Sequence, residues 1–337
     1  MDPLSQGTVG AAFAQSAADK NNIFKVGVIG FLAGLAPDLD VLIQSSTDPI
    51  LFLEYHRQFT HSLFFIPIGS LFVALVLFPL FKKSMSIKNV YFASLLGYAT
   101  HGLLDACTSY GTQLFWPFSN ERVTWNNISI VDPLFTIPVL ILVVIAIKTK
   151  KKIFSFFSIG WIIFYIYLGF IQYERDLLAA FELARVRGHN PERLTLKPSF
   201  GNLILWKSIY QHKETFYVDA IRTAQTSSWC KGESIGVFDY HYHLPNLKKE
   251  SQQKNDIERF RWFSQDYLGY DKERNIVTDV RYSMIPNQIA PMWGLVIDEQ
   301  RGVSEHAIWW TSRSLDHSQI DLFKNMLKGT NCGNSPL

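Results

Sequence analysis

Two stretches of 19 residues carry no charged side chain, and they constrain the fold more than any other feature of the chain. They are LFFIPIGSLFVALVLFPLF at residues 63–81 and IFSFFSIGWIIFYIYLGFI at residues 153–171. The hydrocarbon core of a bilayer is about 30 Å thick and requires roughly 17–25 apolar residues in a helix. Hydrophobic residues make up 48% of the 337-residue chain, and charged residues make up only 18%. We therefore expect membrane-spanning helices, with the buried helices of a large soluble core as the alternative.

Three further apolar stretches bring the expected number of spans to five. They are residues 26–43, 89–107 and 133–147. His101 and Asp105 interrupt one of them, and Asp38 lies near the end of another. Residues 26–43 also fit a re-entrant helix that crosses only half of the bilayer. The expected fold is therefore an α-helical membrane domain of about five spans at residues 1–172.

The basic residues predict the orientation of these spans. Residues 1–20 are polar and rich in alanine without a basic start, so we do not expect a signal peptide there. If each segment crosses once, three groups of lysines fall on one side: Lys20 and Lys25; Lys82, Lys83 and Lys88; and Lys148, Lys150, Lys151 and Lys152. Cytoplasmic loops carry an excess of Lys and Arg. We expect a multi-pass protein of the cell (inner) membrane whose C-terminal half is extracytoplasmic.

Acids and histidines collect at the opposite ends of the same spans. They are Asp38, Asp40, Glu54, His56, His61, His101, Asp105 and Asp132. Ionisable groups within spans are costly and normally face the bundle interior with a partner. A metal ion is one partner that compensates several Asp and His side chains together. Each residue taken alone also has a structural explanation, such as a solvated loop histidine, an intramembrane hydrogen bond or a helix cap.

The spacing of these residues favours a shared site. His101 and Asp105 are four residues apart, so on a helix they project from one face. His56 and His61 would diverge by about 140° on a straight helix, so a helix must begin between them, near Thr60, if both are ligands. The ligand types are nitrogen and oxygen, which fit Zn, Mn or Fe. None of the three cysteines forms a CxxC pair, although Cys230 and Cys332 can pair in an oxidising compartment.

Several motifs together resemble the YdjM-like family of membrane-bound metal-dependent hydrolases. They are MDPLSQG at residues 1–7, AGLAPDLDVL at 33–42, HRQFTHSL at 56–63, THGLLDACTSYGTQLFWPFS at 100–119 and IVDPLF at 130–135. Gln58 stands where the family usually has Gly. The family looks distantly similar to zinc-dependent phospholipases C and single-strand nucleases. The resemblance implies one or two divalent ions, most simply Zn, with ligands from Asp40 or Asp38, from His56 or His61, and from His101 with Asp105.

These residues predict a hydrolytic mechanism. A bound ion would activate water and polarise a phosphoryl or carbonyl oxygen of the substrate. Asp38 or Glu54 would accept the proton, and Arg57 would bind an anionic oxygen. A site at the membrane surface favours an amphiphilic or lipid-linked ester substrate and the lipid bilayer as partner. An ion-coupled transporter and a non-catalytic membrane scaffold are the alternatives, and the net charge of +3 is too small to indicate nucleic acid binding.

The second half of the chain has the composition of a small α+β domain at residues 173–337. Residues 172–188 have helical spacing that ends at Gly188. Short alternating runs predict antiparallel strands: NLILWKSIY, ETFYVDAIR, NIVTDVRYSM, MWGLVID and HAIWWTSR. YHYHL at residues 240–244 also alternates like a strand. Helices are expected towards the end of residues 247–265 and over residues 315–327.

Overall fold

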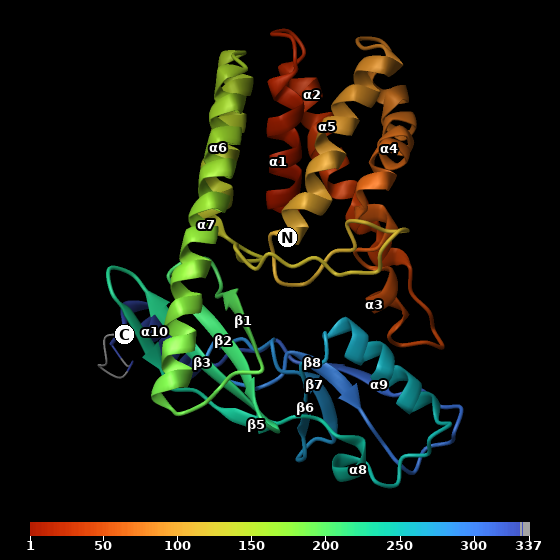
Figure 1. Ribbon diagram of the computed structural model, residues 1–337. Helices are drawn as coiled ribbons and strands as arrows, with labels where there is room; N and C mark the ends of the chain where they lie inside the picture. The colour runs from red at the N-terminus through yellow and green to blue at the C-terminus, as the bar shows by residue number, and fades with distance from the viewer. Residues whose placement is uncertain (331, 333–337) are drawn as a thin grey trace. The chain divides into compact units, whose positions relative to one another are not determined.

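The computed structural model describes residues 1–330 and 332, and the chain divides into two compact units. The first unit comprises Met1–Leu42, Tyr55–Ile171 and Phe200–Leu203. The second comprises Ile43–Glu54, Gln172–Ser199 and Ile204–Leu337. An N-terminal helical region is therefore followed by a C-terminal unit built on β-sheets (Figure 1).

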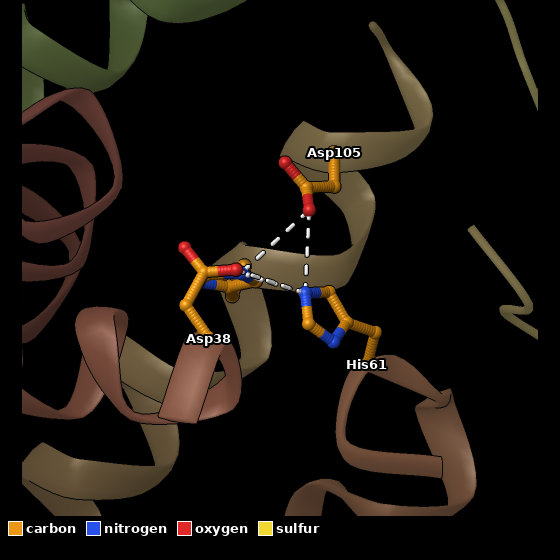
Figure 2. Close-up of side chains that lie close together, drawn as sticks. Asp38, His61 and Asp105 are labelled. Carbon is orange, nitrogen blue, oxygen red and sulfur yellow. Dashed lines mark hydrogen bonds and ion pairs between the residues drawn. The ribbon is translucent and has the colours of Figure 1, made fainter. Parts of the chain in front are cut away.

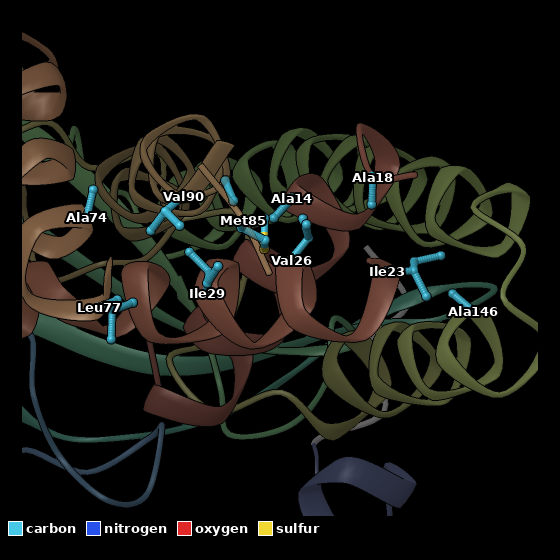
Figure 3. Close-up of a cluster of buried hydrophobic side chains, with 11 residues drawn as sticks. Ala14, Ala18, Ile23, Val26, Ile29, Ala74, Leu77, Met85, Val90 and Ala146 are labelled. Atoms are coloured by element: carbon cyan, nitrogen blue, oxygen red, sulfur yellow. The ribbon is translucent and has the colours of Figure 1, made fainter. Parts of the chain in front are cut away.

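The first unit is built mainly from helices. Its elements are α1 (Pro3–Ser16), α2 (Ile23–Leu35), the 3₁₀ helices η1 (Ala36–Leu42), η2 (Phe59–His61) and η3 (Leu63–Phe65), α4 (Ile66–Phe81), α5 (Ile87–Ala106), α6 (Pro133–Thr149) and the first half of α7 (Ile153–Val186). Buried side chains from α1, α2, α4, α5 and α6 meet in one apolar cluster (Figure 3). Most of them are small or β-branched, which lets the helices approach closely.

Glycines set the distance between α1, α2 and α5, which lie side by side in Figure 1. A Cβ atom at Gly97 of α5 would lie 2.3 Å from the carbonyl oxygen of Gly30 in α2. A Cβ atom at Gly10 of α1 would lie 2.4 Å from the same oxygen. No larger residue fits at these crossings without a backbone shift. The close contact brings the end of α2 against α5, where the predicted ligands lie.

The expectation of five spans is wrong. Among residues 1–330 and 332, two helices are long and apolar enough to cross a membrane, Leu63–Phe81 and Ile153–Val186. The helix in residues 26–43 is α2, whose 13 residues extend only about 20 Å before η1 begins. α6 has 17 residues. α5 has 20 residues, but it is less apolar than the two candidate spans, because it contains polar side chains that include His101 and Asp105.

Sequence reasoning assigned no element to the N-terminal residues, which form α1. The helix begins at Pro3 after Asp2, whose side chain accepts a hydrogen bond from the Ser5 amide. Most of its residues are buried, including Gln6. Its polarity concealed it, because a helix that packs through glycine and alanine needs no long apolar side chains.

The second unit contains two antiparallel sheets. The first has the order β1-β2-β3-β4 with β5 also on β3, and the second has the order β6-β7-β8-β9. The strands are β1 (Arg193–Pro198), β2 (Leu205–His212), β3 (Thr215–Thr223), β4 (Ser227–Cys230), β5 (Ser234–Gly236), β6 (Leu268–Asp271), β7 (Ile276–Asp279), β8 (Trp293–Val296) and β9 (Ile308–Thr311). The helices are α3 (Leu51–Tyr55), which begins in this unit, α8 (Tyr240–His243), α9 (Gln252–Phe263) and α10 (His317–Lys328).

The structure confirms the five predicted strands as β2, β3, β7, β8 and β9, and the two predicted helices as α9 and α10. The strand expected in YHYHL is wrong. Asp239 caps this segment by accepting a hydrogen bond from the Tyr242 amide, so the chain forms the single turn α8. The helix expected at residues 172–188 is the second half of α7, which continues from the apolar run without a break. A disulfide joins Cys230 to Cys332, and Cys107 is a buried free thiol.

Candidate metal centre

Four ligand-type side chains meet inside the first unit. Asp38 lies in η1, His61 ends η2, and His101 and Asp105 lie one turn apart on α5. One ligand atom from each lies within 4.8 Å of the others. Figure 2 shows Asp38, His61 and Asp105 pointing toward one another from separate segments. His61, His101 and Asp105 have fully buried side chains, whereas 26% of the Asp38 side chain is exposed.

Hydrogen bonds orient both imidazoles with the same nitrogen facing the centre. Nδ1 of His101 lies 2.6 Å from the carbonyl oxygen of Gly34, which can only accept a hydrogen bond. Nδ1 of His101 therefore carries the proton and Nε2 is left with a lone pair. Nδ1 of His61 lies 2.9 Å from Thr60 Oγ1, and that hydroxyl donates to Asp40 Oδ2 at 2.8 Å. The Nε2 atom of His61 is thus also directed at the centre.

The distances between these atoms fit a single coordinated cation. The two Nε2 atoms lie 3.0 Å apart. Asp38 Oδ1 lies 3.4 Å from Nε2 of His61 and 3.3 Å from Nε2 of His101. Asp105 Oδ2 lies 3.3 Å and 3.7 Å from the same two nitrogens. Four ligands placed tetrahedrally at about 2.1 Å from a zinc ion are separated by about 3.4 Å.

The Asp105 carboxylate has neighbours that differ between its two oxygen atoms. Its Oδ2 atom is buried and accepts no well-aligned hydrogen bond, although Arg57 Nε lies 3.0 Å away. Its Oδ1 atom accepts a hydrogen bond from Gln6 Nε2 at 2.9 Å and contacts the amino group of Met1. Arg57 and the Met1 amino group offset part of the negative charge of Asp105, and a divalent ion would in addition bind the two Nε2 lone pairs and the carboxylate of Asp38. The residues therefore fit a divalent ion.

Asp40 and His56 form a neighbouring group that shares Asp38 with the first. His56 Nδ1 lies 2.7 Å from Asp40 Oδ1. Asp40 Oδ2 accepts hydrogen bonds from the Arg57 amide at 3.0 Å and from Thr60. All six predicted ligand residues are thus brought together in two adjoining groups. The many hydrogen bonds to Asp40 equip it to orient His56 and His61, as carboxylates beside metal-bound histidines commonly do.

The chain turns between His56 and His61, as the sequence required. Arg57 adopts a left-handed conformation with φ of 65°, and η2 begins at Phe59. The Arg57 side chain is buried, with NH1 donating to Thr108 Oγ1 at 3.2 Å. This guanidinium faces Asp105 within the site. The structure also adds Thr60, Gln6 and the Gly34 carbonyl, which sequence reasoning missed because none is a metal-ligand type.

Two other predicted polar residues have different surroundings. Glu54 belongs to the second unit, where it accepts a hydrogen bond from Arg259 Nε. Its proposed role as a proton acceptor stays a prediction. Asp132 caps α6 through the amides of Leu134 and Phe135, and it accepts a hydrogen bond from Tyr165 at 2.8 Å. That arrangement is structural.

Two comparisons with known proteins find similarities. A family model described as YdjM inner membrane protein matches residues 1–177. Uncharacterized protein YfhP from Bacillus subtilis (strain 168) is 31% identical over 107 residues, which is 32% of this chain and 32% of that relative. The match therefore spans about a third of each protein. No solved structure matches the chain.

Proposed function

From the finding that the chain belongs to the YdjM inner membrane protein family, we propose that it is a metal-dependent hydrolase of the membrane. The metal ligands in this proposal are Asp38, His61, His101 and Asp105. The observation that carries it is the convergence of two imidazole Nε2 atoms, 3.0 Å apart, with carboxylate oxygens 3.3–3.7 Å from them. Two histidines and two carboxylates favour zinc, while Mn and Fe also accept this donor set. The adjoining Asp40 and His56 provide room for a second ion that shares Asp38.

Each residue around the centre has a distinct role in the proposed hydrolysis. A divalent ion supplies Lewis acidity, which activates water and polarises the oxygen of an ester or phosphoester. Gly34 and Thr60 hold the two imidazoles in fixed orientations. Asp38 is the partly exposed carboxylate, so it is placed to receive substrate and accept a proton. Arg57 supplies a buried positive charge for an anionic oxygen of the substrate.

The position of the centre in the chain supports an amphiphilic substrate. His61 is followed almost at once by the apolar segment Leu63–Phe81, so the site lies at one end of a candidate span. An ester linked to a lipid or another amphiphile can reach such a site while its apolar part remains in the bilayer. The proposal therefore takes the bilayer as partner and a phosphoester or other ester at its surface as substrate.

We place this end of the span, and the C-terminal unit, outside the cytoplasm. Lys82 and Lys83 follow the first candidate span, and Lys150, Lys151 and Lys152 directly precede the start of the second. The basic residues assign those ends to the cytoplasm, and α5, which packs along α4, returns His101 and Asp105 to the opposite end. The disulfide between Cys230 and Cys332 supports an oxidising compartment for the C-terminal unit.

Elemental analysis of the full-length protein in detergent tests the proposed site. We expect one or two equivalents of zinc or a similar ion in the wild type, and loss of metal in His101→Ala and Asp105→Asn. His241→Ala is the control, because His241 is exposed and lies in the other unit. Unchanged metal content in both site variants would refute the site.

A second measurement tests the reaction. Vesicles of phospholipid are incubated with the metal-loaded protein, and release of water-soluble phosphate compounds is measured. Metal-dependent release that both site variants lose supports hydrolysis. Metal-dependent ion flux in proteoliposomes without hydrolysis would favour a transporter, and absence of metal from the wild type would favour a scaffold.

A further inference from the structure

We propose that Arg259 is a positioning residue for the metal centre and that it acts through the segment of residues 43–54. The inference rests on the proposed metal site. It concerns how the ligands are held in place, and it gives the C-terminal unit a part in metal binding.

The segment of residues 43–54 joins the two ligand-bearing parts of the first unit along the chain. It begins one residue after η1, which carries Asp38 and Asp40, and ends two residues before His56. Its own contacts nevertheless group it with the second unit. The conformation of this connection therefore depends on residues that follow it by about two hundred positions.

Arg259 of α9 holds the segment at two points. Its NH2 and NH1 groups donate to the two carboxylate oxygens of Asp48 at 2.8 Å and 3.1 Å. Its Nε atom donates to Glu54. A bidentate pair of this kind fixes direction as well as distance. Burial opposes ionisation of Asp48, but the hydrogen bonds from Arg259 hold its pKa below the ordinary value.

Apolar contacts support the same attachment. Phe52 packs edge-on against Trp309, with ring centroids 5.2 Å apart. Ile50 and Leu53 are buried. The segment is thus docked over residues 48–54, and this part does not form a free loop.

Arg259 is itself held in position by a buried acid. Asp256, one turn earlier on α9, lies 3.3 Å from NH1 of Arg259. Asp256 is fully buried, accepts a hydrogen bond from the Ala307 amide at 2.9 Å and contacts His306 Nδ1 at 3.0 Å. The arginine therefore presents a fixed guanidinium to Asp48 and Glu54.

Attachment of residues 43–54 reduces the conformational entropy that the chain loses when the ligands come together. If residues 43–54 were free, the chain on either side would sample many separations before Asp38 and Asp40 met His56 and His61. Attachment through Arg259 removes most of these states in advance. Loss of the attachment should weaken metal binding without removing any ligand.

Zinc affinity of the full-length protein, measured by competition with a chromophoric chelator, tests the inference. We expect Arg259→Ala and Asp48→Asn each to weaken zinc binding by about tenfold, because these residues contact no proposed ligand and act only through the order of the connecting segment. The double variant should bind zinc no more weakly than Arg259→Ala alone, because that change already removes the contact with Asp48. Arg259→Lys should restore part of the affinity. Arg261→Ala is the matched control on the same helix, where Arg261 pairs with Glu258 and Asp266.

The outcomes separate this inference from the proposed function. Wild-type affinity in both Arg259→Ala and Asp48→Asn, or losses that add in the double variant, would overturn the role of Arg259 while leaving the metal site intact. No zinc binding by the wild type would refute the proposed function itself. If Arg259→Ala fails to fold, Asp48→Asn still tests the inference. This change leaves the sequence of α9 and the pairing of Arg259 with Asp256 unaltered.

Discussion

At the scale of the residue, Thr60 shows how a side chain outside the proposed ligand set can orient the ring of a proposed ligand. Its hydroxyl links His61 Nδ1 to Asp40 Oδ2, at 2.9 Å and 2.8 Å. Without the hydroxyl, Asp40 Oδ2 still accepts a hydrogen bond from the Arg57 amide, and His61 Nδ1 lies 3.2 Å from the same oxygen. The ligand remains, but one of the two contacts that orient its ring is lost.

We therefore expect Thr60→Val to lower metal affinity by about 10–100-fold without changing the number of ions bound at saturation. Chelator competition gives the affinity, and elemental analysis at saturating metal gives the number. Thr149→Val is a suitable control, because Thr149 is exposed at the end of α6. Equal affinities of Thr60→Val and wild type would show that the link to Asp40 is not needed.

Lys207 provides a residue-scale prediction in the C-terminal unit. Its ammonium group is buried and donates to Ser283 Oγ and the Gln288 carbonyl, both at 2.7 Å. Burial lowers the pKa of Lys207 to about 7. In the unfolded chain a lysine has a pKa of about 10.4. Between these values the unfolded state binds the proton more tightly, so the free energy of unfolding rises as the pH increases from about 7 to about 10.

Urea unfolding of the oxidised protein at pH 7.5 and 9.5, followed by tryptophan fluorescence, checks this dependence. Lys207→Met should reduce the rise by up to about 1.4 kcal/mol per pH unit, the equivalent of one proton. Some rise should remain, because burial also lowers the pKa of Lys197. Lys324→Met, at an exposed position, should leave the dependence unchanged. An identical pH dependence in Lys207→Met and wild type would contradict the prediction.

The sequence made the six ligand-type residues recognisable, because acids and histidines beside apolar runs are unusual. It did not reveal the atoms that orient them. The carbonyl of Gly34 has no signature in the side chains, and Thr60 resembles any loop threonine. Arg259 lies too far along the chain to be associated with Asp48. These contacts depend on the tertiary fold, which pairs residues irrespective of their separation in sequence.

At the scale of the element, the glycine crossings of α1, α2 and α5 are sensitive to small changes. Gly97→Ala would place a Cβ atom 2.3 Å from the Gly30 carbonyl oxygen and 2.8 Å from the Gly30 Cα atom. Because both neighbours are backbone atoms, the helices must separate. Overpacking of this kind costs about 1–3 kcal/mol.

We expect Gly97→Ala to lower the thermal midpoint of the protein in detergent and to weaken metal binding, because α5 carries His101 and Asp105. Gly160→Ala is the matched control, since a Cβ atom there would meet nothing within 4 Å. It should be neutral or slightly stabilising, because alanine is a better helix former than glycine. If both variants melted alike, the crossing would not be close-packed.

The number of spans was the element-scale feature that apolar composition predicted poorly. An apolar helix is equally stable in lipid and in a protein interior. Composition alone therefore does not distinguish a membrane span from a buried helix. α2 consists of apolar residues, yet η1 ends it before it can reach across a bilayer. Strands were easier to predict, because short runs of aromatic and β-branched residues, such as those of β2 and β3, are typical of strands.

At the scale of the whole molecule, the disulfide gives a test of topology. Cys230 and Cys332 are 102 residues apart, and closure of so long a loop stabilises a protein by roughly 2–5 kcal/mol. In intact cells we expect these two thiols to resist labelling until a reductant is added. Cys107 is buried and should react only after denaturation. Free labelling of Cys230 and Cys332 in denatured, unreduced protein would contradict the pairing and its compartment.

The ligand-type residues lie at positions 38, 61, 101 and 105. A nascent chain therefore contains all four only once α5 has been synthesised. A nascent chain that has left the ribosome only as far as Phe81 already exposes Asp38 and His61 without their partners. The centre can close only after α5 has been synthesised and has packed against α2. Under the proposed function, acquisition of the ion would be a late maturation step, after insertion of the first apolar segment, and the supply of metal would limit how much of the inserted protein becomes active.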